Sequence, residues 1–181
     1  SVASASRRME QPVLQPPARM RAVCHLDVNS FYASVEQARL YPELEGKPVA
    51  VQQRHLLVTT NYECRARGVP KMCSVEKARE ICPDIVCIES DMSRYRDAHR
   101  RLFDLLRGFG LQPERASIDE AYLDLTELAE AEESVTAYAT AETIVYGQQG
   151  TLDLETADGA FLARAGKVAN DIRLKVRQEL R

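Results

Sequence analysis

The chain has 181 residues, of which 45% are hydrophobic and 28% charged, with eight Gly and eight Pro. This length suits one domain, or a domain with a small insertion, and the composition excludes a collagen-like or wholly disordered chain. The net charge of −3 does not by itself indicate a nucleic-acid-binding protein, because such domains are usually strongly basic.

The charge is unevenly distributed. No Lys or Arg lies between Arg115 and Arg164, whereas eleven Asp and Glu residues do. The rest of the chain has 24 basic and 16 acidic residues, and therefore a net charge of +8. A basic surface for a polyanion and a solvated acidic loop both fit this division.

No segment has the features of a membrane anchor or a secretory signal. Apolar runs stay well below the roughly 18 residues of a membrane-spanning helix, and residues 1–21 lack an apolar signal core. We therefore expect a soluble, intracellular protein with no membrane partner. The cysteines are odd in number and match no zinc spacing, so free thiols are expected, with neither disulfide bonds nor zinc. They are Cys24, Cys64, Cys73, Cys82 and Cys87.

The first two thirds of the chain alternate between strand-like and helical segments. Residues 1–20, rich in Pro, Ser and Arg, are expected to form a flexible arm. Apolar runs predict strands at 22–28, 49–51, 56–60 and 85–88. Helical spacing predicts helices at 30–40, 61–68, 74–81 and 93–108, the second capped by Asn61 and the last by Ser93.

The last third carries the acidic segment. Residues 116–118 and 121–125 are expected to form two β segments on either side of a turn at Asp119 and Glu120. An acidic, weakly periodic insertion at 127–156 receives no element, and a final helix begins near Asp158. Strands and helices alternate without a glycine-rich phosphate loop, which makes the fold α+β or α/β, with α+β preferred.

Three acids lie at predicted strand edges. Asp27 follows an apolar strand, and Asp119 and Glu120 lie between two apolar segments. Oxygen ligands in such surroundings suit Mg²⁺ or Mn²⁺, which take one or two carboxylates together with substrate phosphates. In isolation, a polar hairpin turn at Asp119 and Glu120 and a helix cap at Asp27 are the simpler interpretation.

Basic and aromatic residues recur near these acids. Tyr62 and Arg65 share one face of a short helix and could together bind phosphate oxygens, with Lys71 close behind. Phe31 and Tyr32 follow Asp27, so one ring can enter the core while the other overhangs the acid. Taken alone, a solvated helical turn and two core aromatic residues are the simpler interpretation of these patterns.

Together, these segments resemble the Y-family translesion DNA polymerases. The matching motifs occur in the family's order over residues 22–127, and the final helix matches loosely. They are Asp27–Glu36, Gly46–Val51, Thr60–Val69, Tyr95–Arg96 and Ser117–Thr126. Segments 51–58 and 145–149 most resemble the iota subfamily, whereas Ser117–Glu120 has the form common in the eta and kappa subfamilies.

The resemblance implies roles for the residues already singled out. Asp27, Asp119 and Glu120, with the Val28 carbonyl, would hold two Mg²⁺ or Mn²⁺ ions for nucleotidyl transfer. The nucleotide would contact seven residues. Tyr62, Arg65 and Lys71 would hold its phosphates, and Gln53 and Leu56 would lie over the nascent base pair. The ring of Tyr32 would exclude a ribose 2′ hydroxyl, and Phe31 would be a further nucleotide contact.

The resemblance also implies an architecture. It is a ferredoxin-like βαββαβ palm (21–28 and 92–181) that lacks its last strand, with a small α/β fingers insertion (29–91). The thumb and little finger, which hold most of the DNA, are also expected to be missing. Implied partners are primer–template DNA, a deoxynucleoside triphosphate and, through the missing regions, a sliding clamp and other repair proteins; the implied location is the nucleus.

Two alternatives stay open at this point. One is a truncated, non-catalytic module that keeps the fold and binds nucleotide and magnesium or another protein. The other is a different palm-like enzyme, such as a nucleotide cyclase, which would share strand-edge carboxylates but does not predict Tyr32 beside Asp27.

Overall fold

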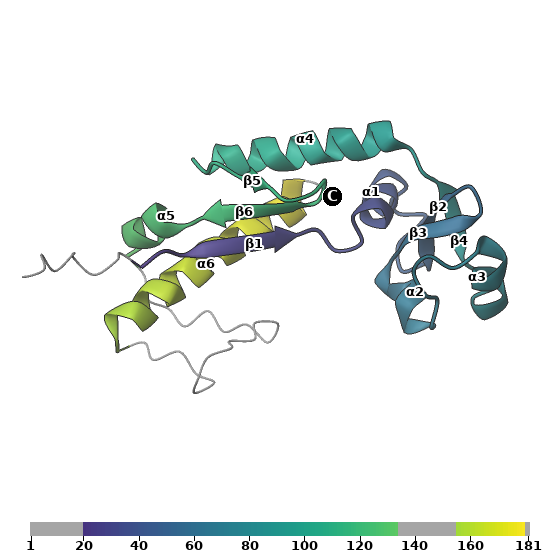
Figure 1. Ribbon diagram of the computed structural model, residues 1–181, viewed down its shortest axis with the longest axis horizontal. Coiled ribbons are helices and arrows are strands. Elements are labelled where there is room, and N and C mark those ends of the chain that lie inside the picture. The colour runs from purple at the N-terminus through teal and green to yellow at the C-terminus, as the bar shows by residue number, and fades with distance from the viewer. Residues whose placement is uncertain (1–19, 134–154, 180–181) are drawn as a thin grey trace, which may run out of the picture.

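The computed structural model describes residues 20–133 and 155–179 (Figure 1). Residues 1–19 of the predicted arm at 1–20 and most of the insertion at 127–156 lie outside these residues. The strands are β1 (Val23–Asp27), β2 (Val49–Gln53), β3 (Leu56–Thr60), β4 (Val86–Glu89), β5 (Glu114–Arg115) and β6 (Glu120–Asp124). The helices are α1 (Phe31–Arg39), α2 (Tyr62–Ala66), α3 (Val75–Ile81), α4 (Met92–Gly108), α5 (Thr126–Ala131) and α6 (Ala157–Glu179).

The first sheet is antiparallel, with the strand order β1-β6-β5. Because side chains alternate along a strand, β1 and β6 turn one set of residues toward the helices and the other set away from them. The inward-facing Ala121 and Leu123 are fully buried and pack with residues of α4 and α6, among them Leu102, Leu106 and Ile172. The helices therefore cover one face of this sheet and leave the face that carries Asp27 and Glu120 uncovered by that core.

The second sheet is mixed, with the order β3-β2-β4, in which β2 is antiparallel to β3 and parallel to β4. Its central strand is apolar on both sides, and Val49, Ala50 and Val51 are all fully buried. Ala50 packs with side chains of α2 and α3, whereas Val49 and Val51 pack with α1 and with Tyr95 of α4. A strand buried on both faces needs such a continuous apolar run.

Helix α1 lies between the two sheets, and α4 runs from the second sheet back along the first (Figure 1). The two helices are joined by the carboxylate of Glu36, which is fully buried. It accepts hydrogen bonds from Arg39 Nε at 2.8 Å, Arg94 Nη1 at 3.1 Å and Tyr95 Oη at 3.3 Å. This cluster fixes the position of α1 relative to α4, and hence the spacing between the sheets.

The predicted α+β class is confirmed, and most predicted elements occur within a residue or two. Asn61 and Ser74 cap α2 and α3 through their side chains. The prediction that Ser93 caps α4 is wrong, because Asp91 is the cap and its carboxylate accepts bonds from both the amide and the hydroxyl of Ser93.

Two further corrections concern the acidic third. The β segment predicted at 116–118 lies earlier, as β5, because the amides of Ala116 and Ser117 both donate to the Glu120 carbonyl and close a turn there. Glu120 itself is the first residue of β6 rather than part of the turn. Helix α5 was not predicted.

Across the described residues, no helix is both long and apolar enough to cross a membrane.

Candidate active site

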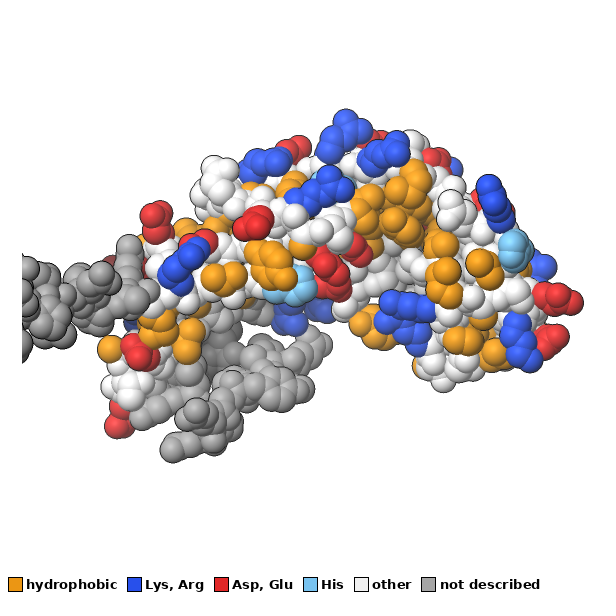
Figure 2. Space-filling model, viewed as in Figure 1, with side chains coloured by type: hydrophobic (Ala, Val, Ile, Leu, Met, Phe, Trp, Pro, Cys, Tyr) orange, Lys and Arg blue, Asp and Glu red, His pale blue; other side chains and the backbone are white. Residues whose placement is uncertain are grey.

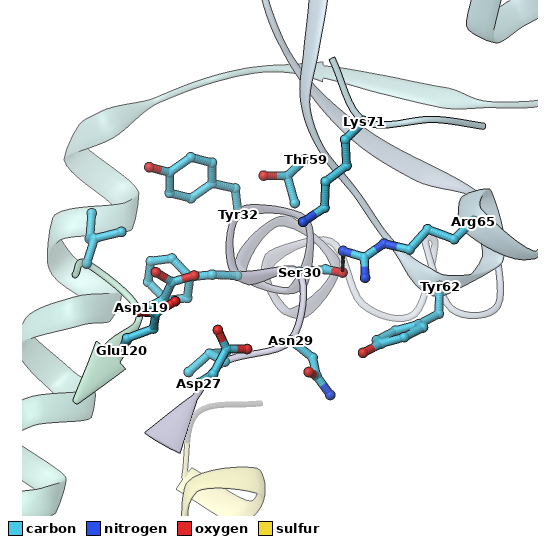
Figure 3. Close-up of a pocket in the computed structure, with 13 residues that line it drawn as sticks. Asp27, Asn29, Ser30, Tyr32, Thr59, Tyr62, Arg65, Lys71, Asp119 and Glu120 are labelled. Carbon is cyan, nitrogen blue, oxygen red and sulfur yellow. Dashed lines mark hydrogen bonds between the residues drawn. The ribbon is translucent and has the colours of Figure 1, made fainter. Parts of the chain in front are cut away.

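A cavity of about 420 Å³ lies where β1 ends, between the two sheets. Its lining includes residues that are far apart in the sequence, from the β1–α1 connection, α2 and the turn before β6. Figure 3 shows Asp27, Asp119 and Glu120 on one side of it and Tyr62, Arg65 and Lys71 on the other. In Figure 2 the hollow between the sheets likewise has acidic side chains on its left margin and basic ones on its right.

The acidic side is built by the pairing of β1 with β6. Asp27 lies directly opposite Glu120 in the antiparallel register, so both side chains project from the same face of the sheet. The Val28 amide donates to the Asp119 carbonyl at 3.1 Å, which holds the turn against the end of β1. The Asp119 carboxylate accepts a 2.7 Å bond from the Ser117 hydroxyl.

These contacts argue against the simpler interpretation of the three acids as a helix cap and a polar hairpin turn. Asp27 does not cap α1, because Ser30 occupies the cap position of that helix. Glu120 lies in a strand, so the acids do not form an isolated polar hairpin turn. Carboxylates from distant segments instead share one cavity.

The donor set on this side suits a hard divalent cation. Asp27, Asp119, Glu120 and the Val28 carbonyl present oxygen atoms only, the ligands that Mg²⁺ and Mn²⁺ prefer. Within residues 20–133 and 155–179, no three His, Cys, Asp or Glu side chains form a ready-made metal-binding group. The fit therefore rests on the chemistry of these donors and on the cavity that they share.

The basic side centres on Arg65, which is partly buried. Its Nε donates to the Thr60 carbonyl at 3.1 Å and its Nη2 to the Ser30 hydroxyl at 2.8 Å. The guanidinium also lies 4.9 Å from the centre of the Tyr62 ring. No described carboxylate forms an ion pair with Arg65 or with the exposed Lys71. Two positive charges that pair with no carboxylate of the described residues thus face the cavity, an arrangement suited to a polyanion.

The two aromatic residues after β1 both line the cavity but differ in burial. Phe31 is 5% exposed and belongs to the core, whereas Tyr32 is only partly buried. The Tyr32 ring is stacked on Tyr95. Burial raises the pKa of Tyr95 to about 12, so this phenol stays neutral and can donate its proton to Glu36.

The other predicted nucleotide contacts are not brought to this cavity. Gln53 and Leu56 line a separate hollow at the β2–β3 turn. Four further residues line the main cavity and were not predicted from the sequence: Asn29, Ser30, Thr59 and Ile118. For Asn29, Ser30 and Ile118, the only signal in the sequence was that each is next to a predicted site residue. Thr59 reaches the cavity because β3 pairs with β2, which the sequence does not show.

Comparison with known proteins places the chain in a family. Residues 26–181 match the model of the impB/mucB/samB family. The chain therefore belongs to this family, whose members are the Y-family polymerases. The chain is 38% identical to DNA polymerase IV of Bacillus velezensis over 162 residues, covering 84% of this chain and 37% of that protein. It is 42% identical to human DNA polymerase iota over 130 residues, covering 71% and 17% respectively.

The fold has a counterpart among solved structures. A structure described as a Dbh ternary complex with partially disordered substrates has a TM-score of 0.57 and 35% sequence identity. The match covers 61% of this chain and 33% of that one. The chain thus spans less than half the length of these relatives. Similar identities to a bacterial polymerase IV and to an animal polymerase iota leave the iota-like assignment a prediction.

Proposed function

We propose that the chain is the nucleotide-binding part of the catalytic core of a DNA-directed DNA polymerase that acts in translesion synthesis. The observation that carries this proposal is the composition of the cavity, with three carboxylates on one side and Tyr62, Arg65 and Lys71 on the other. A triphosphate placed between them would meet cationic groups at its tail and oxygen ligands for divalent ions at its α-phosphate.

The proposed chemistry is nucleotidyl transfer. The 3′ oxygen of a primer attacks the α-phosphorus, the bond from that phosphorus to the bridging oxygen breaks, and pyrophosphate leaves while the hydroxyl proton passes to solvent. Asp27, Asp119, Glu120 and the Val28 carbonyl would hold the Mg²⁺ or Mn²⁺ ions. Such ions, once bound, make the hydroxyl more acidic and neutralise charge on the leaving oxygens.

The chain's own side chains position the nucleotide. Arg65 offers a planar set of donors to phosphate oxygens, and Lys71 adds a point charge. Tyr62 extends the phosphate contact with its hydroxyl. Tyr32 would exclude a ribose 2′ hydroxyl with its ring, and its stacking on Tyr95 supports this role because it leaves the ring little freedom to move aside.

The proposal also assigns the two sheets to polymerase subdomains and names the binding partners. We assign the first sheet with α4 and α6 to the palm (21–28 and 92–181) and the second sheet with α1, α2 and α3 to the fingers (29–91). Primer–template DNA is the proposed macromolecular partner, consistent with the ternary complex named for the Dbh relative. The relatives come from bacteria as well as animals, so the nuclear location stays a prediction, as do the clamp and repair partners.

The direct test is primer extension in the presence of Mg²⁺ by a polypeptide that carries these residues and continues through the segments present in the relatives. We expect extension by the unmodified protein and its loss in Asp119→Ala. Extension that survives Asp119→Ala would refute the proposed ligand set. A chain that binds a deoxynucleoside triphosphate but never extends a primer in this longer context would favour the alternative, a non-catalytic nucleotide-binding module.

A further inference from the structure

Ser30 has a backbone conformation that serine seldom adopts. Its φ of 49° and ψ of 44° place it in the left-handed region, where residues other than glycine are uncommon. Although Ser30 occupies the cap position of α1, its side chain caps no helix amide. Backbone conformations of this kind persist when surrounding contacts hold them, and they cluster at functional sites.

The hydroxyl of Ser30 forms hydrogen bonds with residues of other elements instead. It donates to the Thr60 carbonyl at 3.0 Å. It also accepts a hydrogen bond from Arg65 Nη2 at 2.8 Å (Figure 3). Arg65 Nε donates to the same Thr60 carbonyl at 3.1 Å. The three residues thus form a closed set of hydrogen bonds that ties the guanidinium of α2 to the start of α1 and the end of β3.

Both acceptors that hold Arg65 are uncharged. A carboxylate in place of the hydroxyl would orient the guanidinium equally well but would also neutralise it. A hydroxyl and a carbonyl fix its direction and leave its full charge to the cavity, which suits a group that must bind an anionic ligand.

We propose that Ser30 is a positioning residue whose hydroxyl, together with the Thr60 carbonyl, holds Arg65 in the orientation that binds the triphosphate of the incoming nucleotide. This inference rests on the proposed function of the cavity. Ser30 acts through Arg65, so its replacement by glycine should weaken nucleotide binding without lowering the stability of the fold, because relief of the positive φ offsets the lost hydrogen bonds.

The test separates these two effects by comparing Ser30→Gly with Ser30→Ala. Glycine adopts positive φ without strain, so Ser30→Gly should unfold at the same or a higher temperature than the unmodified chain. Its dissociation constant for a deoxynucleoside triphosphate with Mg²⁺, measured by calorimetry, should nevertheless rise about three- to tenfold, the range for one ordinary lost hydrogen bond, because Arg65 keeps its bond to the Thr60 carbonyl. Ser30→Ala should weaken binding equally. Ser34→Ala, which removes a hydroxyl bonded to the Asn29 carbonyl in the same turn, should leave binding unchanged.

A double-mutant cycle shows whether Ser30 acts through Arg65. Arg65→Gln should weaken binding more than Ser30→Gly does, and adding Ser30→Gly to Arg65→Gln should have no further effect. Unchanged binding in Ser30→Gly beside weakened binding in Arg65→Gln would overturn this inference alone, and so would strictly additive effects. Unchanged binding in Arg65→Gln would overturn the triphosphate site and this inference with it.

Discussion

The ring of Tyr32 is stacked on the ring of Tyr95, with centroids 4.1 Å apart and planes inclined by 16°. Tyr95 is fully buried in α4, and its hydroxyl donates to the buried carboxylate of Glu36. The side chain that α1 presents to the cavity is therefore held by a residue of a different helix, and the discrimination that we assign to Tyr32 should depend on Tyr95.

Replacing Tyr95 tests this dependence. Tyr95→Leu removes the stacked ring, and we expect the preference for a deoxynucleoside over a ribonucleoside triphosphate to fall about threefold, as for loss of one aromatic pair. Tyr95→Phe keeps the ring and should keep the preference. The measurement is the ratio of the two dissociation constants for the same base.

The same ratio tests Tyr32 itself. Tyr32→Ala should abolish most of the preference, whereas Tyr32→Phe should retain it because exclusion depends on the ring rather than on the hydroxyl. An unaltered ratio in Tyr32→Ala would show that another group selects the sugar.

The Glu36 cluster predicts a stability effect. Glu36→Gln removes a buried negative charge that pairs with Arg39 and Arg94. Because both guanidinium groups are partly exposed, we expect unfolding to become easier by about 1 to 3 kcal/mol rather than by the larger amount typical of a wholly buried pair. Urea denaturation measures this change, with the exposed Glu43→Gln as a control near zero. Equal stability of the two variants would mean that the cluster does not join α1 to α4.

The Asp124 carboxyl group should make the free energy of unfolding depend on pH in acid. Hydrogen bonds from Thr126 and then from Arg21 lower its pKa from 3.8 to about 2. A carboxyl whose pKa is lower in the folded state contributes stability that is present above pH 3.8 and is lost as the pH falls through about 2. The unfolding free energy of Asp124→Asn should consequently decline less than that of the unmodified chain over this interval. Parallel profiles would contradict the assignment.

Local sequence patterns predicted most elements because the relevant interactions are local. The Asn61 and Ser74 side chains bond to amides three residues on, so capping can be recognised from a few neighbouring residues. The start of α4 was misplaced because Asp91 and Ser93 are both good caps, and only the structure shows that Ser93 donates to Asp91.

The site was predicted only in part, for a physical reason. Motif resemblance identified Asp27, Asp119 and Glu120, and the sheet register places the first opposite the last. The role that we propose for Ser30 depends on a backbone with positive φ and on a partner 35 residues away. Such contacts leave no periodicity in the sequence. The position of Gln53 and Leu56 beside a separate hollow likewise depends on how the β2–β3 turn folds.

The most direct test of the central claim is calorimetric titration of the chain with a deoxynucleoside triphosphate, with Mg²⁺ and then with the metal chelated. We expect Mg²⁺ to strengthen binding, Asp119→Asn to remove this gain, and Asp104→Asn, on the exposed face of α4, to retain it. Equal affinity with and without Mg²⁺, or an undiminished gain in Asp119→Asn, would contradict the claim that these carboxylates and Arg65 hold the two ends of one nucleotide.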